Sequence, residues 1–269
     1  MSSRLNFQNK QEYIEEVWDD GFSSLGIDVN EPKQSKVVLW DADSVLHFVL
    51  YSGKDEFGNR NPEYIEADLE MLQGKLTEFV LKTLNSVEKY FNILSLYIFI
   101  KGKNNFRKEL LPTYKANRPA PNPLISKLYE YFKIAHQAIE AENAEAEDYV
   151  YTLSKKIDNN GIILSIDHDN DEIPGIHYNY KTDKWRKITP EQARMSKIQK
   201  LIVSESGDNV NLAKGLGIKH FQKNYNSSMS DEEIEEQLLK SYTKVWKDEN
   251  IAKEKLELAK QLLFLKEIK

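Results

Sequence analysis

The sequence predicts an α/β protein whose mainly parallel central sheet is flanked by helices. Three short apolar segments, at residues 36–41, 93–100 and 161–166, have the composition of buried parallel strands. Stretches with helical periodicity separate them, and such alternation is typical of a parallel sheet. The first and third strands end directly at aspartates, at the sheet edge where α/β proteins gather their functional groups.

Spacing and cap residues predict the elements around these strands. A long helix is expected over about 64–91, because apolar residues recur there at intervals of three and four. After a proline-rich connector, a helix is expected over about 124–135, and another opens at Asn143, a suitable N-cap, and runs to about Lys156. Beyond Asp208 the chain is expected to be largely helical.

The same features divide the chain into three predicted parts. A polar N-terminal extension occupies residues 1–35, and an α/β core occupies residues 36–200. A helical subdomain is expected at residues 201–269, packed against the sheet.

Composition excludes several classes of protein. The chain has no cysteine, so it has no disulfide framework, no thiolate metal site and no cysteine nucleophile. Its start lacks the apolar region of a signal peptide, and the densest apolar stretch, residues 93–100, is too short to cross a bilayer. We therefore expect a cytoplasmic protein with no membrane partner.

The charge is unevenly distributed along the chain. The net charge of −6 argues against a nucleic-acid partner, because phosphate binders usually have a basic surface. Residues 101–118, however, contain six basic side chains against Glu109 alone, so this window carries +5 and the remainder −11. Such a window is either a solvated loop or a site for an anionic partner.

Acidic residues form groups that the predicted fold would bring together, at strand ends, at a helix start and before a glycine-bearing turn: Asp41; Asp167 and Asp169; Glu145, Glu147 and Asp148; Glu205 and Asp208. Taken singly, each group is more often solvated surface, since the chain has 43 acids. Their common position favours a metal site, because gathered anions repel one another unless divalent cations neutralise them. Oxygen ligands suit Mg²⁺ or Mn²⁺, so we infer a two-metal hydrolytic site.

The segment FRKELLPTYKANR, residues 106–118, closely resembles the signature of the 5′-nucleases. This family comprises the bacteriophage 5′-3′ exonucleases, the nuclease domain of bacterial DNA polymerase I and the flap endonucleases. The acidic groups and the turn from Gly215 to Gly217 follow in the family's order, over about residues 37–223. The resemblance implies a PIN-like nuclease fold with a helical arch in residues 101–135 and a helix-two-turn-helix in the C-terminal subdomain.

The resemblance also implies a role for each acid. The first of two Mg²⁺ ions would be held by Asp41, Glu145 and Glu147, and Mn²⁺ would substitute for Mg²⁺. The second ion would be held by Asp167, Asp169 and a carboxylate from Glu205 or Asp208. Asp148 would act as an auxiliary acid, and Lys115 and Arg118 would meet the scissile or neighbouring phosphates.

Further residues are implied to contact DNA, and they come from the arch and from the helix-two-turn-helix: Lys101, Lys103, Phe106, Arg107, Tyr114, Gly215, Gly217 and Lys219. The two aromatic residues either stack on bases or anchor the arch by packing. The glycine turn grips duplex backbone in the family, with K⁺ as a further ion. Leu212 stands where relatives usually have another glycine.

The chain departs from the family at the end of its second strand, where Ile100 replaces a metal-site aspartate. Because alternate residues of an extended segment share a face, Asp43 is expected to stand beside Asp41 and to compensate as a ligand. Glu205 replaces the usual aspartate. His168 is expected to lie in an extended run and to point away from both neighbouring aspartates.

We therefore expect a metal-dependent 5′-3′ exonuclease and flap endonuclease of the free-standing bacteriophage type. Its substrates would be DNA with 5′ single-stranded flaps or ends, and RNA primers annealed to DNA. It would act in DNA replication, as a monomer that meets replication proteins. Two alternatives remain open, a catalytically degenerate DNA-junction binder, which Ile100 favours, and a single-strand ribonuclease of PIN-like architecture.

Overall fold

The computed structural model describes residues 25, 31–51, 69–118, 120, 122–203 and 206–268. The predicted N-terminal extension, residues 1–35, lies almost entirely outside them. The strands are β1 (Ser35–Asp41), β2 (Asn92–Ile100), β3 (Ile139–Glu140), β4 (Gly161–Leu164), β5 (Gly175–Asn179) and β6 (Lys184–Ile188). The α-helices are α2 (Asp43–Tyr51), α3 (Leu69–Glu88), α4 (Phe106–Leu110), α5 (Pro123–His136), α6 (Ala146–Lys156), α7 (Pro190–Val203), α8 (Ile218–Asn224), α9 (Asp231–Trp246) and α10 (Glu249–Leu263), and the 3₁₀-helices are η2 (His168–Glu172) and η3 (Ser206–Asp208).

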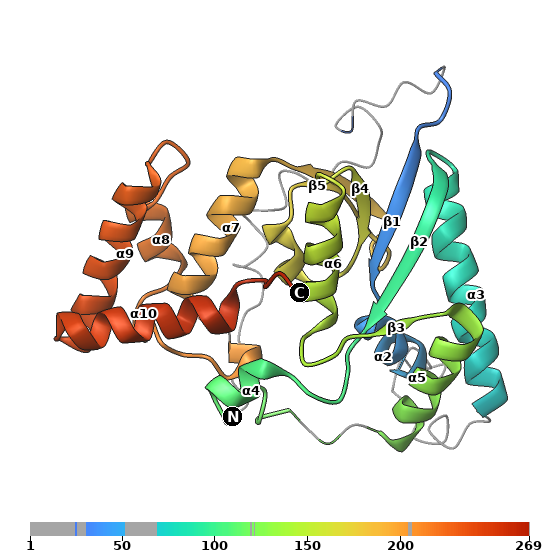
Figure 1. Cartoon of the computed structure of the whole chain (residues 1–269), viewed down its shortest axis with the longest axis horizontal. Coiled ribbons are helices and arrows are strands. Elements are labelled where there is room, and N and C mark those ends of the chain that lie inside the picture. The colour runs from blue at the N-terminus through green and yellow to red at the C-terminus, as the bar shows by residue number, and fades with distance from the viewer. Residues whose placement is uncertain are drawn as a thin grey trace, which may run out of the picture.

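The strands form one sheet in the order β3-β2-β1-β4-β5-β6. Neighbouring strands are parallel, except that β5 and β6 form an antiparallel hairpin. The predicted α/β fold with a mainly parallel sheet is confirmed. β1 lies between β2 and β4, so the acids at the ends of β1 and β4 reach the same edge of the sheet (Figure 1).

Helices cover both faces of the sheet, which is why the central strands are apolar on both sides. Val38 and Trp40 of β1 belong to the larger core, with residues of α2, α3 and α5. Leu39 points to the other face, where it packs with Ala146 and Val150 of α6. This alternation along one strand is what a parallel strand buried on both faces requires.

Helix α6 begins later than the sequence indicated. Its N-cap is Glu145, whereas Asn143, the predicted cap, lies before the helix in a left-handed conformation with φ of 51°. Two residues that are two positions apart in a regular helix point in different directions. Glu145 has extended backbone because it precedes the helix, so this restriction does not apply to Glu145 and Glu147. The difference matters for the site, because both carboxylates come from the entrance of this helix.

The predicted extended run around His168 is wrong. Asp167 caps the short helix η2, and its Oδ1 accepts a hydrogen bond of 3.0 Å from the backbone N–H of Asp169. His168 is exposed and its Nδ1 lies 3.2 Å from Oδ2 of Asp171. The hairpin of β5 and β6 follows η2.

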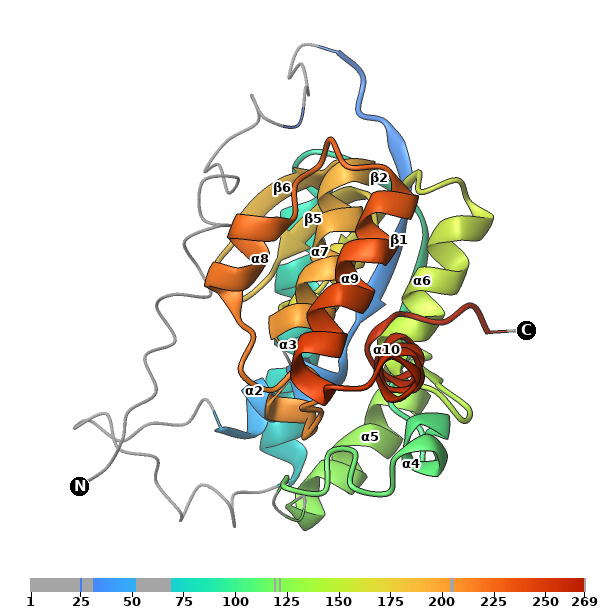
Figure 2. The same cartoon turned by 90° about the vertical axis from the view of Figure 1, so that its left-hand side faces the viewer.

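The C-terminal part is helical, as predicted. Helices α7, α8, α9 and α10 enclose a second core that includes Leu201, Phe221 and Tyr242 (Figure 2). Helix α7 runs across residue 200, so the boundary between the predicted core and the predicted subdomain stays a prediction. None of the helices in the described ranges is both long enough and apolar enough to span a membrane.

Candidate active site

Asp41, the last residue of β1, is the most deeply buried of the predicted metal ligands at the sheet edge. Its side chain is almost inaccessible, and its Oδ2 accepts hydrogen bonds from Ser165 Oγ (3.1 Å) and Asn170 Nδ2 (2.9 Å). Both donors come from the segment that follows β4. They therefore fix one oxygen of Asp41 and leave Oδ1 as the oxygen that could meet a cation.

The surroundings of Asp41 disfavour its ionised form. Burial, together with the nearby carboxylates of Asp43 and Asp167, raises the pKa of Asp41 to about 8, although the hydrogen bonds from Ser165 and Asn170 act in the other direction. The pKa of Glu147 is also raised well above its usual value by burial and by Glu145. Divalent cations are what would allow these acids to ionise together.

This shift predicts an effect on stability. Folding raises the pKa of Asp41 from 3.8 to about 8, so the folded chain holds a proton that the unfolded chain has released. The contribution of this residue to stability therefore falls as pH rises from about 4 to about 8. In EDTA, we expect Asp41→Asn to melt higher than wild type at pH 8, by roughly 2–4 °C for each kcal/mol relieved, and the gain to shrink towards pH 5. Thermal unfolding at both pH values checks this, and a gain that is equal at the two would contradict it.

Glu145 and Asp208 are linked by side chains of the predicted arch. The hydroxyl of Tyr114 donates to Glu145 Oε2 (2.9 Å) and to Asp208 Oδ2 (2.8 Å). Lys115 Nζ pairs with Glu145 Oε1 and lies 3.6 Å from Asp208 Oδ2, and Arg118 Nη2 lies 2.9 Å from Asp208 Oδ1. Burial would raise the pKa of Glu145, but Lys115 and Arg107 outweigh it and hold this pKa below its usual value.

Asp167 and Asp169, which we call the second acidic group, lie at the entrance of η2. Lys200 Nζ from α7 lies 3.0 Å from Asp169 Oδ1 and 2.7 Å from Glu172 Oε1. Burial would raise the pKa of Asp169, but Lys200 outweighs it and lowers this pKa. Desolvation by the surrounding protein and the Asp169 carboxylate raise the pKa of Asp167.

A cavity of about 220 Å³ connects the second acidic group to the arch. Its lining includes Asp167, Asp169, Lys200, Asp208 and Arg118. A cavity lined by several carboxylates and by two basic side chains has the charges to receive a phosphate together with cations.

Asp43 does not stand beside Asp41 in an extended segment, because β1 has ended and Asp43 opens α2. Instead, its Oδ1 accepts hydrogen bonds from the backbone N–H of Lys101 (2.5 Å) and from Tyr129 (3.2 Å). Ile100, at the position where the resemblance led us to expect an acid, is fully buried at the end of β2. The Asp43 carboxylate thus lies next to the strand end that lacks its own acid, which keeps it a candidate ligand by a different route.

Three predicted site residues have structural surroundings that the sequence did not indicate. Arg107 is only 2% exposed, and its guanidinium donates to both oxygens of Asp148 (2.6 and 2.8 Å), so it is not available to a DNA phosphate. Asp148 is itself fully buried in this pair. Tyr114 is 2% exposed, so its ring packs in the C-terminal core and does not stack on a base.

The other predicted DNA contacts are exposed or partly exposed. Lys101, Lys103 and Lys219 are exposed, and Phe106 is half-buried under the Arg107 guanidinium. Gly215 adopts a φ of 86° in the turn before α8, a conformation that favours glycine, and Gly217 is the N-cap of α8. Glu205, a predicted metal ligand, lies outside the described residues.

The donor set fits divalent cations in its chemistry, but its members are not yet gathered around a point. Among the residues that the structure describes, no three acidic or histidine side chains stand close enough to form a ready-made metal site. The ammonium groups of Lys115 and Lys200 lie on Glu145 and Asp169 instead. In this structure, the positive charge that balances Glu145 and Asp169 comes from these two lysines.

Several residues around the acids were not identified from the sequence. Ser165, Asn170, Glu172 and Lys200 all contact a predicted ligand or a neighbour of one. For Ser165, the only signal in the sequence was its position two residues before the predicted ligand Asp167. Lys200 resembles any other lysine of an amphipathic helix until its burial is known.

Comparisons with known proteins identify the family and agree with the fold. A family model, 5′-3′ exonuclease, N-terminal resolvase-like domain, matches residues 36–191. A bacteriophage T5 protein co-crystallised with metal ions has a TM-score of 0.63 at 17% identity, over 86% of this chain and 90% of that chain. The bacteriophage T5 flap endonuclease in a pseudo-enzyme-product complex with DNA and metal ions has a TM-score of 0.56 at 17% identity, over 85% of this chain and 90% of that chain.

The T5 5′-exonuclease with bound zinc has a TM-score of 0.57 at 17% identity, over 85% of this chain and 90% of that chain. At this identity, the likeness to solved structures shows a shared fold. No curated protein matches the chain in sequence.

Proposed function

The chain belongs to the 5′-3′ exonuclease family, and on this premise we propose that it is a divalent-metal-dependent, structure-selective 5′-nuclease that hydrolyses phosphodiester bonds near the 5′ ends of DNA. One observation carries the proposal. Acids from β1, α6 and η2 meet at one edge of the sheet, and burial and mutual repulsion raise the pKa of Asp41 to about 8 and the pKa of Glu147 well above its usual value. Ionising these buried carboxylates together is costly unless cations are bound.

We assign the ligands in two groups. Asp41, Glu145 and Glu147 would hold one ion, with Asp43 as a further carboxylate near the end of β2. Asp167, Asp169 and Asp208 would hold the other, with Glu205 joining them. Ions held at these positions would lower the pKa of a bound water and would stabilise charge on the leaving oxygen.

Other side chains of the protein would orient the metal ligands and bind the DNA phosphates. Ser165 and Asn170 hold Oδ2 of Asp41, so that its Oδ1 is presented in a fixed direction. Lys115 and Arg118 lie on the carboxylates of Glu145 and Asp208, from which they can transfer to DNA phosphates when cations neutralise those carboxylates. Backbone contacts of this kind give affinity that depends on salt and not on sequence.

The proposal is tested with end-labelled substrates. A 5′-flap duplex, a nicked duplex, single-stranded DNA and an unstructured RNA are incubated with Mg²⁺, with Mn²⁺ and with EDTA. We expect cleavage of the flap and nicked duplexes near their 5′ ends in either metal, and none in EDTA. Preferential cleavage of the unstructured RNA would instead support a PIN-like ribonuclease.

Lys115→Ala should separate cleavage from metal binding. The variant loses a cation expected at the scissile phosphate, so we expect turnover of the flap substrate to fall by about 10²-fold. It also removes the ammonium group from Glu145, so Mn²⁺ should bind several-fold more tightly in the absence of DNA. Flap kinetics and Mn²⁺ calorimetry measure the two effects. Lys127→Ala, at an exposed position of α5, is the matched control, and weaker Mn²⁺ binding by Lys115→Ala would contradict the assignment.

Ile100 favours a second candidate, a DNA-junction binder that has lost cleavage. It is fully buried where the family has a ligand, so one carboxylate is missing from the sheet edge. This candidate predicts tight flap binding without cleavage in Mg²⁺ or Mn²⁺, and Ile100→Asp would not restore cleavage. Cleavage by the wild-type chain excludes it.

We propose that the enzyme acts in the cytoplasm during DNA replication, as a monomer, on flaps and on RNA primers annealed to DNA, and alongside replication proteins. The turn at Gly215 and Gly217 would grip duplex backbone, with K⁺ as the ion in the turn. Primer removal is tested by adding an RNA segment to the 5′ end of the nicked substrate.

A further inference from the structure

The last described residues of the chain, 264–268, continue from the end of α10 and reach α6, and we call them the strap (Figure 1). The side chain of Leu265 is buried between Leu39 of β1, Val150 of α6 and their neighbours. The backbone N–H of Ile268 donates to Thr152 Oγ1 (2.8 Å), which ties the far end of the strap to α6. The strap is therefore a packed part of the α/β core, although it follows the last helix of the C-terminal part.

One strap amide is linked through Asp148 to Glu145 and Glu147, two of the ligands proposed for the first ion. The N–H of Lys266 donates to Asp148 Oδ1 (2.8 Å). The other oxygen of Asp148 accepts the backbone N–H of Glu145 (3.0 Å), and Asp148 directly follows Glu147 in the chain. Holding Asp148 thus holds the entrance of α6, from which both glutamates project.

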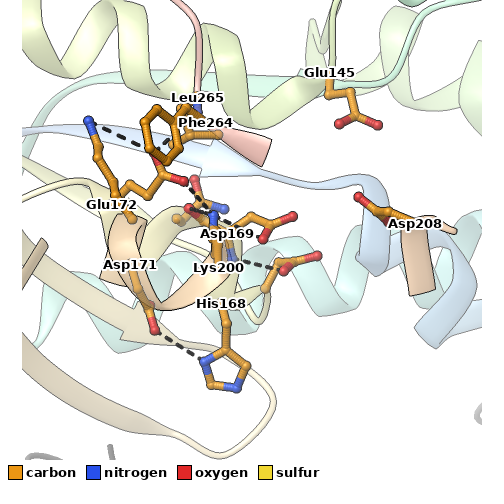
Figure 3. A network of polar contacts seen from close by, with 12 residues as sticks. Glu145, His168, Asp169, Asp171, Glu172, Lys200, Asp208, Phe264 and Leu265 are labelled. Atoms are coloured by element: carbon orange, nitrogen blue, oxygen red, sulfur yellow. Dashed lines mark hydrogen bonds and ion pairs between the residues drawn. The ribbon is translucent and has the colours of Figure 1, made fainter. Parts of the chain in front are cut away.

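The preceding strap amide reaches the second acidic group through Glu172 (Figure 3). The N–H of Leu265 donates to Glu172 Oε2 (3.1 Å), while Glu172 Oε1 accepts from Lys200 Nζ (2.7 Å). The same ammonium group lies 3.0 Å from Asp169 Oδ1. Two successive backbone amides therefore lead, each through one buried carboxylate, to the two halves of the predicted metal site.

Arg107 completes this arrangement. Its Nε donates to the carbonyl of Leu262 (2.9 Å) and its Nη2 to the carbonyl of Phe264 (3.0 Å), while the guanidinium also pairs with Asp148. The start of the strap, the base of the arch and the entrance of α6 are thus joined at one buried group. Buried carboxylates need every such partner, because a lost hydrogen bond leaves charge unsatisfied.

We propose that the strap is a positioning element for the metal ligands, in which the amides of Lys266 and Leu265 fix Asp148 and Glu172 and thereby set the positions of Glu145, Glu147 and Asp169. This inference rests on the proposed function. Partners that orient metal ligands are typically worth 10–100-fold in metal affinity. The two amides are backbone groups, so their role is independent of the side chains at these positions.

The test compares two substitutions at one residue. Lys266→Pro removes the N–H that Asp148 accepts, whereas Lys266→Ala keeps it and changes only the side chain. Mn²⁺ binding to the full chain without DNA is measured by calorimetry. We expect Lys266→Pro to weaken binding by at least about 10-fold relative to Lys266→Ala, which should bind as wild type does. The kinetic expectation is a higher Mg²⁺ concentration for half-maximal cleavage, with KM for the flap substrate unchanged.

The outcomes separate this inference from the proposed function. If wild type binds Mn²⁺ and the two variants give the same isotherm, the strap has no positioning role. If wild type binds no Mn²⁺, the proposed function fails and this inference fails with it.

A second measurement applies if Lys266→Pro does not fold. In wild type, Mn²⁺ binding should slow hydrogen exchange at the amides of Leu265 and Lys266, because coupling between two sites is reciprocal. Unchanged exchange at both amides under saturating Mn²⁺ would overturn the proposal.

Discussion

Replacing Asp41 by Asn is expected to lower turnover of a 5′-flap substrate by about 10³-fold or more, equivalent to several kcal/mol of transition-state stabilisation. Asp41 is buried at the end of β1, and its Oδ2 is held by Ser165 and Asn170. Asparagine has the same shape and can accept the same two hydrogen bonds, but it lacks the negative charge. The loss would therefore report on the cation that the charge holds, with the fold left intact.

Three measurements on Asp41→Asn make this interpretation specific. Affinity for flap DNA in Ca²⁺ should stay within a few-fold of wild type, while Mn²⁺ affinity and turnover fall together. Asp231→Asn, at a side chain that is 83% exposed, makes the same chemical change away from the sheet edge and should cleave as wild type does. Turnover of Asp41→Asn within about 10-fold of wild type would exclude Asp41 as a metal ligand.

Replacing Arg107 by Ala is expected to cost about 3–5 kcal/mol of folding free energy, because it leaves the fully buried Asp148 carboxylate without its counter-ion. The variant also loses the hydrogen bonds to the carbonyls of Leu262 and Phe264. This residue was expected to contact DNA, and a surface DNA contact would instead have almost no effect on stability. Urea unfolding in EDTA measures the difference.

Controls for Arg107→Ala come from its neighbour and from its partner. Lys108→Ala removes an exposed basic residue of α4 and should change the free energy of unfolding by less than about 0.5 kcal/mol. The double replacement of Arg107 by Met and Asp148 by Leu removes both charges and should recover part of the loss. An Arg107→Ala chain as stable as Lys108→Ala would show that the buried pair does not form.

Local pattern was sufficient for the main elements of the fold. The apolar runs ending at Asp41 and before Asp167 predict strands, because short runs rich in β-branched residues are typical of strands buried on both faces. Their acids fall at one edge because parallel neighbours share direction. The start of α6 could not be predicted from local preference, because both Asn143 and Glu145 can precede a helix and tertiary contacts at Asp148 select the second.

Which basic side chains point into the protein and which point to solvent could not be predicted from the sequence. Arg107, Lys108 and Lys115 belong to one basic window, but Arg107 is buried because Asp148, far away in sequence, lies opposite it. Lys200 and Glu172 pair for the same reason, and the strap amides carry no signal in a sequence at all. Contacts between distant segments decide these positions, and a single sequence contains no record of them.

We expect acids from β1, α6 and η2 to converge on two divalent cations, and this convergence is the basis of the proposed function. A crystal structure of the chain with Mn²⁺ and a 5′-flap DNA, with anomalous scattering recorded at the manganese edge, tests it most directly. We predict two anomalous peaks about 4 Å apart, one at Asp41, Glu145 and Glu147 and the other at Asp167, Asp169 and Asp208. If DNA is bound, no manganese peak lies at these carboxylates and Lys115 is still paired to Glu145, the carboxylates do not hold the ions.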